Sequence, residues 1–160
     1  MKKVTLVLGM IAMTISSFAQ TKINTLVDEM TDEVSYRVDK RLVISNPAQT
    51  KGFAIEPYIK EKNGKIYAEM MLVSLVGLGN CNEKNKIIIL FDDGSKFTSL
   101  SWNSFNCTGD AYFTFTKDEI KQLSTKTLSK IRVQNGETFE SLTADVEAKN
   151  YFIEFYKLLN

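Results

Sequence analysis

The chain has 160 residues, with 20 basic and 19 acidic side chains and no histidine. Because histidine is the usual general base near neutral pH and the commonest metal ligand, its absence excludes Ser-His-Asp and Cys-His hydrolases, His-dependent zinc enzymes and haem sites with a proximal histidine. The net charge of +1 gives no electrostatic reason to expect nucleic acid or an anionic membrane as a partner.

Residues 1–19 predict a cleaved signal peptide. Lys2 and Lys3 precede an apolar run over residues 4–15, and Ser17-Phe18-Ala19 supplies the small-x-small exit before Gln20. The run is too short to cross a bilayer, which takes about 20 residues as a helix. We therefore expect a periplasmic or secreted protein that begins near Gln20.

The remainder, residues 20–160, predicts a single β-rich domain. Its length suffices for one sizeable core and is too short for two. No further apolar run approaches the length of a membrane span, so none is expected.

Two cysteines, Cys81 and Cys107, predict a disulfide. An even cysteine count in an oxidising compartment is normally paired. Closing this loop would stabilise the fold by about 3–4 kcal/mol in the chain-entropy model. Two buried free thiols are the alternative, and the spacing excludes a catalytic CxxC pair.

The first strands are predicted from period-two alternation. Apolar side chains alternate along residues 34–38 and again along 42–44, on either side of the polar break Asp39-Lys40-Arg41, which favours a hairpin. A strand over residues 53–60 follows.

A turn at Lys62-Asn63-Gly64-Lys65 then leads into a long strand over residues 66–76. This strand is apolar on both faces except at Glu69, which favours burial on both sides.

The next elements are a hairpin, a strand and a helix. Asp93-Gly94 is a strong turn signal between strands 86–91 and 96–102, and a short strand covers residues 111–115. Thr116 followed by Glu119 predicts a capping box for a helix that ends near Ser124. Phe115 and Ile120 stand where a hydrophobic staple places them, and Ile120 and Leu123 are expected to be buried.

A second hairpin joins residues 128–133 to 137–143 around Asn135-Gly136. A two-residue loop would place Ile131 opposite a charge, whereas a three-residue loop pairs apolar with apolar and charge with opposite charge. We therefore predict a bulge at Gly136 and three pairs: Ile131 with Phe139, Lys130 with Glu140, and Leu128 with Leu142.

A helix over residues 145–159 is predicted to close the chain. One face carries an aromatic and apolar stripe, which we expect to pack on a sheet rather than bind a partner: Ala148, Phe152, Phe155, Tyr156 and Leu159. The expected fold is mainly β (α+β), an antiparallel β-sandwich or partly open barrel with one short internal helix and a C-terminal helix packed on the sheet.

The second half of the chain resembles small exported domains of Gram-negative bacteria whose function is uncharacterised. The resemblance implies export and no particular activity. It rests on Phe91-Asp92-Asp93-Gly94, Cys107, Ala111-Tyr112-Phe113, Thr116-Lys117-Asp118-Glu119-Ile120, Lys130-Ile131-Arg132-Val133 and the terminal helix.

The segment Trp102–Asn106 is a candidate ligand-binding loop. Aromatic faces beside amides suit a sugar ring, which would assign binding roles to Trp102, Asn103 and Phe105. Burial of Trp102 in the core, with Phe105 plugging the loop, is the alternative.

Glu69 is a weak catalytic candidate. An inward carboxyl in an apolar strand would have a raised pKa, as a general acid requires, but a glycosidase needs a second carboxylate nearby. A solvent-facing or lysine-paired glutamate is the alternative.

Two glycine-containing segments are expected to be turns. Asp92-Asp93-Gly94-Ser95 lacks the further acidic positions of a calcium loop, so we expect no metal. Gly77-Leu78-Gly79 lacks the third glycine and the helix of a dinucleotide site, so we expect no cofactor.

The sequence thus favours an exported, non-enzymatic domain that binds an envelope or extracellular partner, either protein or glycan. A small glycan- or ligand-binding module using Trp102–Asn106 is the first alternative. A carboxylate-based hydrolase is the second.

The intact mass of the protein purified from its native compartment tests the leader and the disulfide together. We expect a chain that starts near Gln20 and gains two hydrogens on reduction, because Cys81 and Cys107 are bridged. A chain that starts at Met1 with both thiols free would contradict both predictions.

Overall fold

A computed structural model describes residues 22–77, 85–101, 109–134, 136 and 141–159. The predicted signal peptide and both cysteines lie outside these residues. No helix in the described ranges is both long and apolar enough to span a bilayer.

Six strands form the first antiparallel sheet. Its order is β1-β2-β4-β5-β8, and β3 pairs with β4 beside that path. The strands are β1 (Ile23–Asp28), β2 (Glu33–Val38), β3 (Leu42–Ser45), β4 (Gly52–Lys62), β5 (Lys65–Val76) and β8 (Asp110–Thr114).

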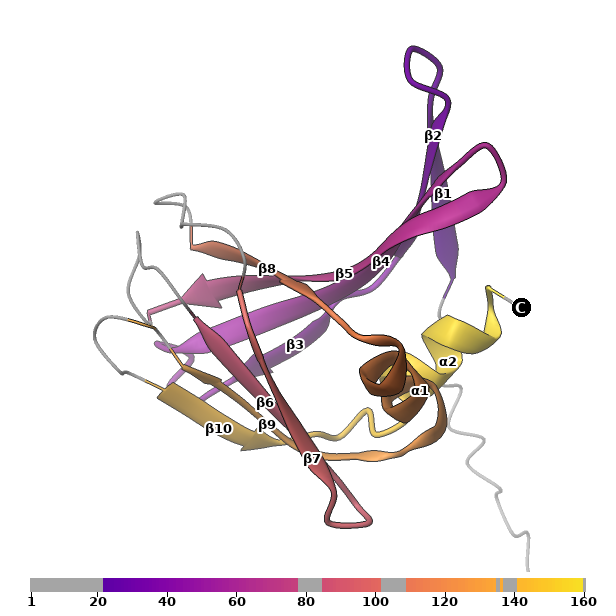
Figure 1. Cartoon of the computed structure of the whole chain (residues 1–160). Coiled ribbons are helices and arrows are strands. Elements are labelled where there is room, and N and C mark those ends of the chain that lie inside the picture. Colours follow the sequence, from indigo (N-terminus) through magenta and orange to yellow (C-terminus); the bar gives the residue numbers. More distant parts are fainter. Residues whose placement is uncertain (1–21, 78–84, 102–108, 135, 137–140, 160) are drawn as a thin grey trace, which may run out of the picture.

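Four strands form the second sheet, in the order β10-β9-β6-β7, and it packs against the first (Figure 1). The strands are β6 (Lys86–Phe91), β7 (Lys96–Leu100), β9 (Leu128–Gln134) and β10 (Ser141–Asp145). The sheets approach each other at β7 and β8, where Ser99 Oγ donates to the Thr114 carbonyl over 3.4 Å. This arrangement confirms the predicted antiparallel β-sandwich.

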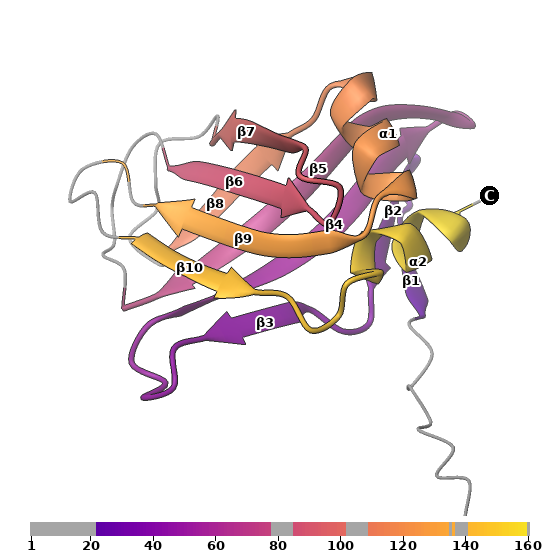
Figure 2. The same ribbon diagram turned by 90° about the horizontal axis from the view of Figure 1, so that it is seen from below.

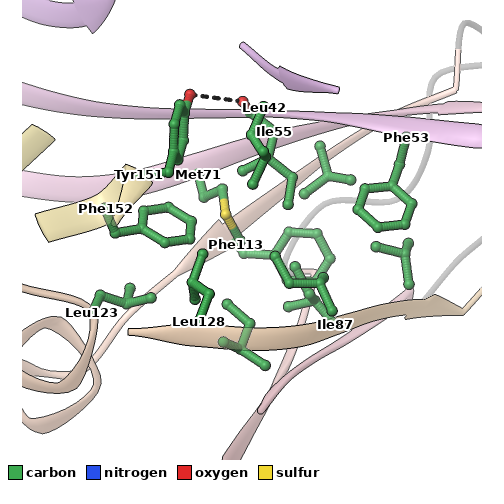
Figure 3. Close-up of a cluster of buried hydrophobic side chains, with 14 of the residues drawn as sticks. Leu42, Phe53, Ile55, Met71, Ile87, Phe113, Leu123, Leu128, Tyr151 and Phe152 are labelled. Atoms are coloured by element: carbon green, nitrogen blue, oxygen red, sulfur yellow. Dashed lines mark hydrogen bonds between the residues drawn. The ribbon is translucent and has the colours of Figure 1, made fainter. Parts of the chain in front are cut away.

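One apolar layer fills the space between the sheets (Figure 3). Both sheets contribute side chains with no measurable exposure, including Ile55, Met71 and Phe113 from the first and Ile87 and Ile131 from the second. Helix α2 (Tyr151–Lys157) closes one end of this layer with the buried rings of Phe152 and Phe155. The predicted stripe therefore packs on the core at Phe152 and Phe155, with Tyr156 and Leu159 partly buried against it, whereas Ala148 does not take part.

Helix α1 (Lys117–Thr125) begins where the sequence predicts. The Thr116 hydroxyl accepts from the Glu119 amide, and the Glu119 carboxylate accepts from the Thr116 amide over 2.8 Å. These reciprocal bonds satisfy helix-end donors that otherwise lack partners. Leu123 is buried and Ile120 is half-buried.

The two expected turns at Gly64 and Gly94 are confirmed. Asn63 and Gly64 both have positive φ, which a tight two-residue hairpin requires. Gly94 also has positive φ and donates its amide to the Phe91 carbonyl over 3.0 Å.

Strand β5 is buried on both faces only over part of its length. Met71, Leu72 and Val73 are buried, whereas Ile66 and Tyr67 are exposed. The prediction of continuous burial was wrong at this end, because β4 and β5 extend past the second sheet there (Figure 1).

The predicted hairpin between residues 34–38 and 42–44 was wrong. Both segments are strands, but each pairs with a different half of β4. Tyr36 lies opposite Ile59, while Ile44 lies opposite Phe53. The polar break at residues 39–41 therefore connects two strands that follow one another along the same edge of β4.

The predicted register of the second hairpin was also wrong. Lys130 pairs with Asp145 rather than Glu140, and their Nζ and Oδ1 atoms lie 3.1 Å apart. Ile131 pairs with Ala144 rather than Phe139, and Val133 with Leu142. Residues 137–140 lie outside the described residues.

The three-residue loop predicted around Gly136 was wrong as well, because Gln134 pairs with Ser141 and six residues lie between them. A bulge does occur at Ser129, in the ladder between β9 and β6. Leu90 pairs with Lys130 and Phe91 with Leu128, so Ser129 is the extra residue. An extra residue shifts the alternation by one position. Leu128 and Ile131 can therefore both face the core, where both are buried.

The terminal helix is shorter than the predicted 145–159. Asp145 ends β10, and the chain continues the ladder beyond it: the Val146 amide donates to the Ser129 carbonyl over 3.0 Å, and the Leu128 amide to the Lys149 carbonyl over 2.9 Å. The helix begins only after these bonds, and Ala148 is exposed.

Tyr151 fastens α2 to the first sheet. Its hydroxyl lies 3.0 Å from the Lys40 carbonyl and 3.1 Å from the Ile55 carbonyl, and donates to these two acceptors. Burial raises the pKa of Tyr151, so the hydroxyl remains a donor throughout the ordinary pH range.

Tyr151→Phe should lower the free energy of unfolding by about 1–2 kcal/mol, because buried carbonyls lose a donor. Urea denaturation measures this change. Tyr67→Phe is the matched control, since its exposed hydroxyl bonds Glu33 at the surface and its loss should cost less than about 0.5 kcal/mol. Equal effects for the two variants would contradict this role of Tyr151.

Candidate functional site

Strand β3 has one paired edge and one open edge. In the described part of the chain it pairs only with β4. The Asn46 amide donates to the Lys51 carbonyl, so alternation directs the backbone groups of Leu42 and Ile44 toward β4. The N–H and C=O groups of Val43 and Ser45 therefore point away from the sheet.

Two hollows flank this open edge. One of about 580 Å³ is lined by residues 40–43 and by residues 147–151. The ribbon of β3 and of the segment between β10 and α2 can be followed in Figure 2. The other, of about 550 Å³, lies on the outer face of the sheet beside Ala54, Ser74 and Val76. Both hollows include Arg41 and Val43, so they meet at β3. We call residues 40–45 with these two hollows the β3 rim.

A buried carboxylate fixes the charged side of the β3 rim. Glu56 comes from β4, and its side chain is only 6% exposed. Arg41 Nε lies 2.8 Å from Glu56 Oε2, and Arg37 Nε lies 3.5 Å from Oε1. Two guanidinium groups on one carboxylate leave an excess of one positive charge. Arg41 remains 48% exposed and can bind an anionic group from solvent.

Aromatic packing holds Arg37 in place. Its guanidinium lies 5.1 Å from the centroid of the Tyr58 ring, and Tyr58 packs edge-on against Tyr112 at 6.3 Å. Such cation–π and aromatic contacts restrict the orientation of the side chains. The Arg37 guanidinium is therefore held by Glu56 and by the Tyr58 ring together.

Val43 supplies the apolar side of the β3 rim. Its side chain is 69% exposed, and Val76 on β5 is exposed on the same hollow. The register aligns Val43 with Ala54 and Ala54 with Ser74, so the floor of this hollow consists of small side chains.

The Glu56 cluster was missed by sequence reasoning. Glu56 stands between two buried residues, Ile55 and Pro57, and nothing in that tripeptide indicates a charged partner. Arg37 reaches it from β2, and Arg41 reaches it from the segment between β2 and β3. The only available signal was a lone acid in the middle of an apolar strand, the same signal that singled out Glu69.

Glu69 lies half-buried on β5. Burial raises its pKa, and no described carboxylate contributes to that rise. One oxygen, Oε2, is buried and has no hydrogen-bond partner among the described residues. The Glu69 charge in turn raises the pKa of Tyr156, whose burial contributes more. The structure thus places Tyr156 near Glu69, and Glu69 lies apart from the residues of the β3 rim.

The Asp92-Asp93-Gly94-Ser95 segment forms the expected hairpin turn. Asp93 Oδ2 lies 2.8 Å from Lys126 Nζ, and Asp92 Oδ2 lies 3.0 Å from Lys149 Nζ. The ion pair with Lys126 and the hydrogen bonds from Ser95 lower the pKa of Asp93 to about 2. Each carboxylate is therefore engaged by an ammonium group.

The remaining predicted sites are only partly described. Gly77 has positive φ and packs against the backbone of Thr50, as a turn glycine does. The candidate loop Trp102–Asn106, with Trp102, Asn103 and Phe105, lies outside the described residues and stays a prediction. The described residues contain no cluster of three or more acidic or cysteine side chains arranged to hold a metal.

Comparisons with protein-family models, with curated proteins and with solved structures give no significant match.

Glu69→Gln should stabilise the protein at neutral pH by about 0.5–1 kcal/mol, because the variant removes a half-buried charge whose Oε2 has no hydrogen-bond partner in the described part of the chain. Because the pKa of Glu69 is raised in the folded state, the native state binds a proton at this carboxyl more tightly than the unfolded state does. Stability is therefore lost as pH rises from the usual value of 4.5 through the folded-state pKa.

The measurement is the free energy of unfolding across pH for the native chain, Glu69→Gln, and Glu29→Gln as an exposed control. We expect the Glu69→Gln gain to vanish below about pH 4, where the native carboxyl is also neutral. A loss of stability at neutral pH would show that the Glu69 carboxylate makes a favourable contact.

Proposed function

We propose that this chain is an exported, non-enzymatic domain that binds an envelope or extracellular partner protein by adding an extended segment of that partner to β3. The open edge of β3, with a hollow on each side, is the observation that carries this proposal. Export rests on the predicted signal peptide. The absence of histidine supports a binding role over catalysis.

The hollows match the geometry of an added strand. Successive side chains of a strand point to opposite faces of the sheet. A segment paired with Val43 and Ser45 would therefore direct one side chain into the outer hollow and the next toward residues 147–151. Backbone hydrogen bonds would supply affinity, and the two hollows would supply sequence preference.

The charges at the outer hollow favour an acidic partner segment. The Arg37–Glu56–Arg41 cluster carries one excess positive charge, and the outer hollow is lined by Arg41 and Lys51, whereas Glu147 and Glu154 line the other hollow. Because an arginine has five donors in a planar fork, its contact with Glu56 through Nε leaves capacity for a second carboxylate. We therefore expect Asp or Glu in the bound segment beside Arg41.

An array of random ten-residue peptides, probed with the purified protein, tests this function. We expect binding to a subset enriched in Asp or Glu, and Val43→Pro should reduce that binding at least about tenfold. Proline removes the outward Val43 N–H but leaves the Leu42 and Ile44 bonds to β4 in place. Val43→Thr keeps the N–H and a β-branched side chain, and should retain binding.

A glycan array probed in parallel separates the main alternative. Glycan binding that survives Val43→Pro, with no peptide bound, would contradict the proposal and favour the Trp102–Asn106 loop. Peptide binding that is equal for the native chain and for correctly folded Val43→Pro would also contradict it.

A further inference from the structure

Strand β1 forms a second open edge, at the opposite end of the first sheet from β8. In the described residues it pairs only with β2, and the β1–β2 hairpin extends away from the two packed sheets (Figure 1). The Asp39 amide donates to the Lys22 carbonyl, so alternation directs the backbone groups of Asn24 and Leu26 toward β2. The N–H and C=O groups of Ile23, Thr25 and Val27 point outward.

This edge lacks the features that normally prevent strands from pairing with another chain. Edge strands are usually short, bulged, or interrupted by proline or lysine. The strand Ile23–Asp28 is six residues long, regularly paired with β2, and contains neither proline nor lysine. Leu26 is 54% exposed and Val27 is 62% exposed.

We propose that a second copy of this chain pairs with β1, antiparallel and centred on Thr25. Residues 22–28 are self-complementary in that register. The pairs across the two-fold axis are Lys22 with Asp28, Ile23 with Val27, Asn24 with Leu26, and Thr25 with Thr25. Opposite charges meet at both ends, and apolar side chains meet on the inner face.

The outward backbone groups restrict the choice of register. Hydrogen-bonded pairs must form among Ile23, Thr25 and Val27 of the two copies. The two-fold axis must therefore pass through a residue position of β1 and cannot lie between two residues. Centring on Asn24 places Lys22 opposite Leu26, and centring on Leu26 places Asp28 opposite Asn24. Only the Thr25 register pairs both charges and aligns the whole strand.

The inner face of β1 offers further apolar surface for the second copy. A hollow of about 280 Å³ lies beneath Ile23 and Thr25, and it is lined from the other side by Ile66, Leu158 and Leu159. Ile66 and Leu158 are exposed. Val27 of the second copy would lie beside Ile23 at this hollow, so association would cover apolar side chains that water contacts in the single chain.

The paired arrangement is an isologous dimer in which two six-stranded sheets form one continuous sheet. The β3 rim is separate from this contact, because β3 pairs with β4 at residues 52–55 while β2 pairs with residues 58–62. The inference therefore stands or fails independently of the proposed function.

Sedimentation equilibrium of the purified protein over a range of concentrations tests the proposal. We expect reversible association to a dimer and no larger species. Thr25→Pro should remain a monomer throughout, because proline removes an outward N–H without removing a bond to β2. Thr25→Val keeps the N–H and should dimerise. Far-ultraviolet circular dichroism confirms that both variants are folded.

A charge exchange tests the register, and remains decisive even if Thr25→Pro does not fold. Lys22→Glu should weaken the dimer by about threefold to tenfold, since it creates two like-charge pairs. Adding Asp28→Lys should restore most of the loss, and Asp28→Lys alone measures the cost of losing the hydrogen bonds that the Asp28 carboxylate accepts from the Met30 amide and the Thr31 hydroxyl. A native chain that stays monomeric at millimolar concentration would overturn the proposal, as would a folded Thr25→Pro variant that dimerises normally or a charge exchange that restores nothing.

Discussion

The packing of aromatic and aliphatic side chains between the two sheets is the interaction on which the rest of the structure depends. Phe113 from the first sheet and Phe155 from α2 have no measurable exposure, and Tyr151 attaches α2 to the sheet through backbone carbonyls. A sandwich of this kind buries side chains but leaves the outer strands of each sheet without a neighbour. The core therefore determines which backbone groups remain available.

The open edges of β3 and β1 carry side chains and hollows that are not needed to pack the core. At β3 the edge is flanked by hollows and by an arginine pair held on Glu56. At β1 the edge carries exposed apolar side chains and a charge pattern complementary to itself. In the proposed dimer one continuous sheet would carry two β3 rims, so a partner with two suitable segments would bind more tightly than a partner with one.

Local signals in the sequence predicted local structure well. Thr116 and Glu119 predicted the start of α1, and Asn63-Gly64 and Asp93-Gly94 predicted tight turns, because each structure depends on residues a few positions apart. The mainly β architecture also followed from alternation.

Long-range pairing was not predictable in the same way. Alternation along residues 34–38 and 42–44 is identical whether the strands pair with each other or with β4. Lys130 has acidic partners available at Glu140 and Asp145, and it pairs with Asp145 in the structure. The role of Glu56 became evident only from its ion pairs with Arg37 on β2 and with Arg41 between β2 and β3.

The central claim is that β3 has one bonded edge and one edge free to bind, and amide hydrogen exchange resolved by residue tests it most directly. The account predicts that the Leu42 and Ile44 amides exchange at least about a hundredfold more slowly than those of Val43 and Ser45. Equal protection of all four amides would show that the edge is already occupied and would contradict the account.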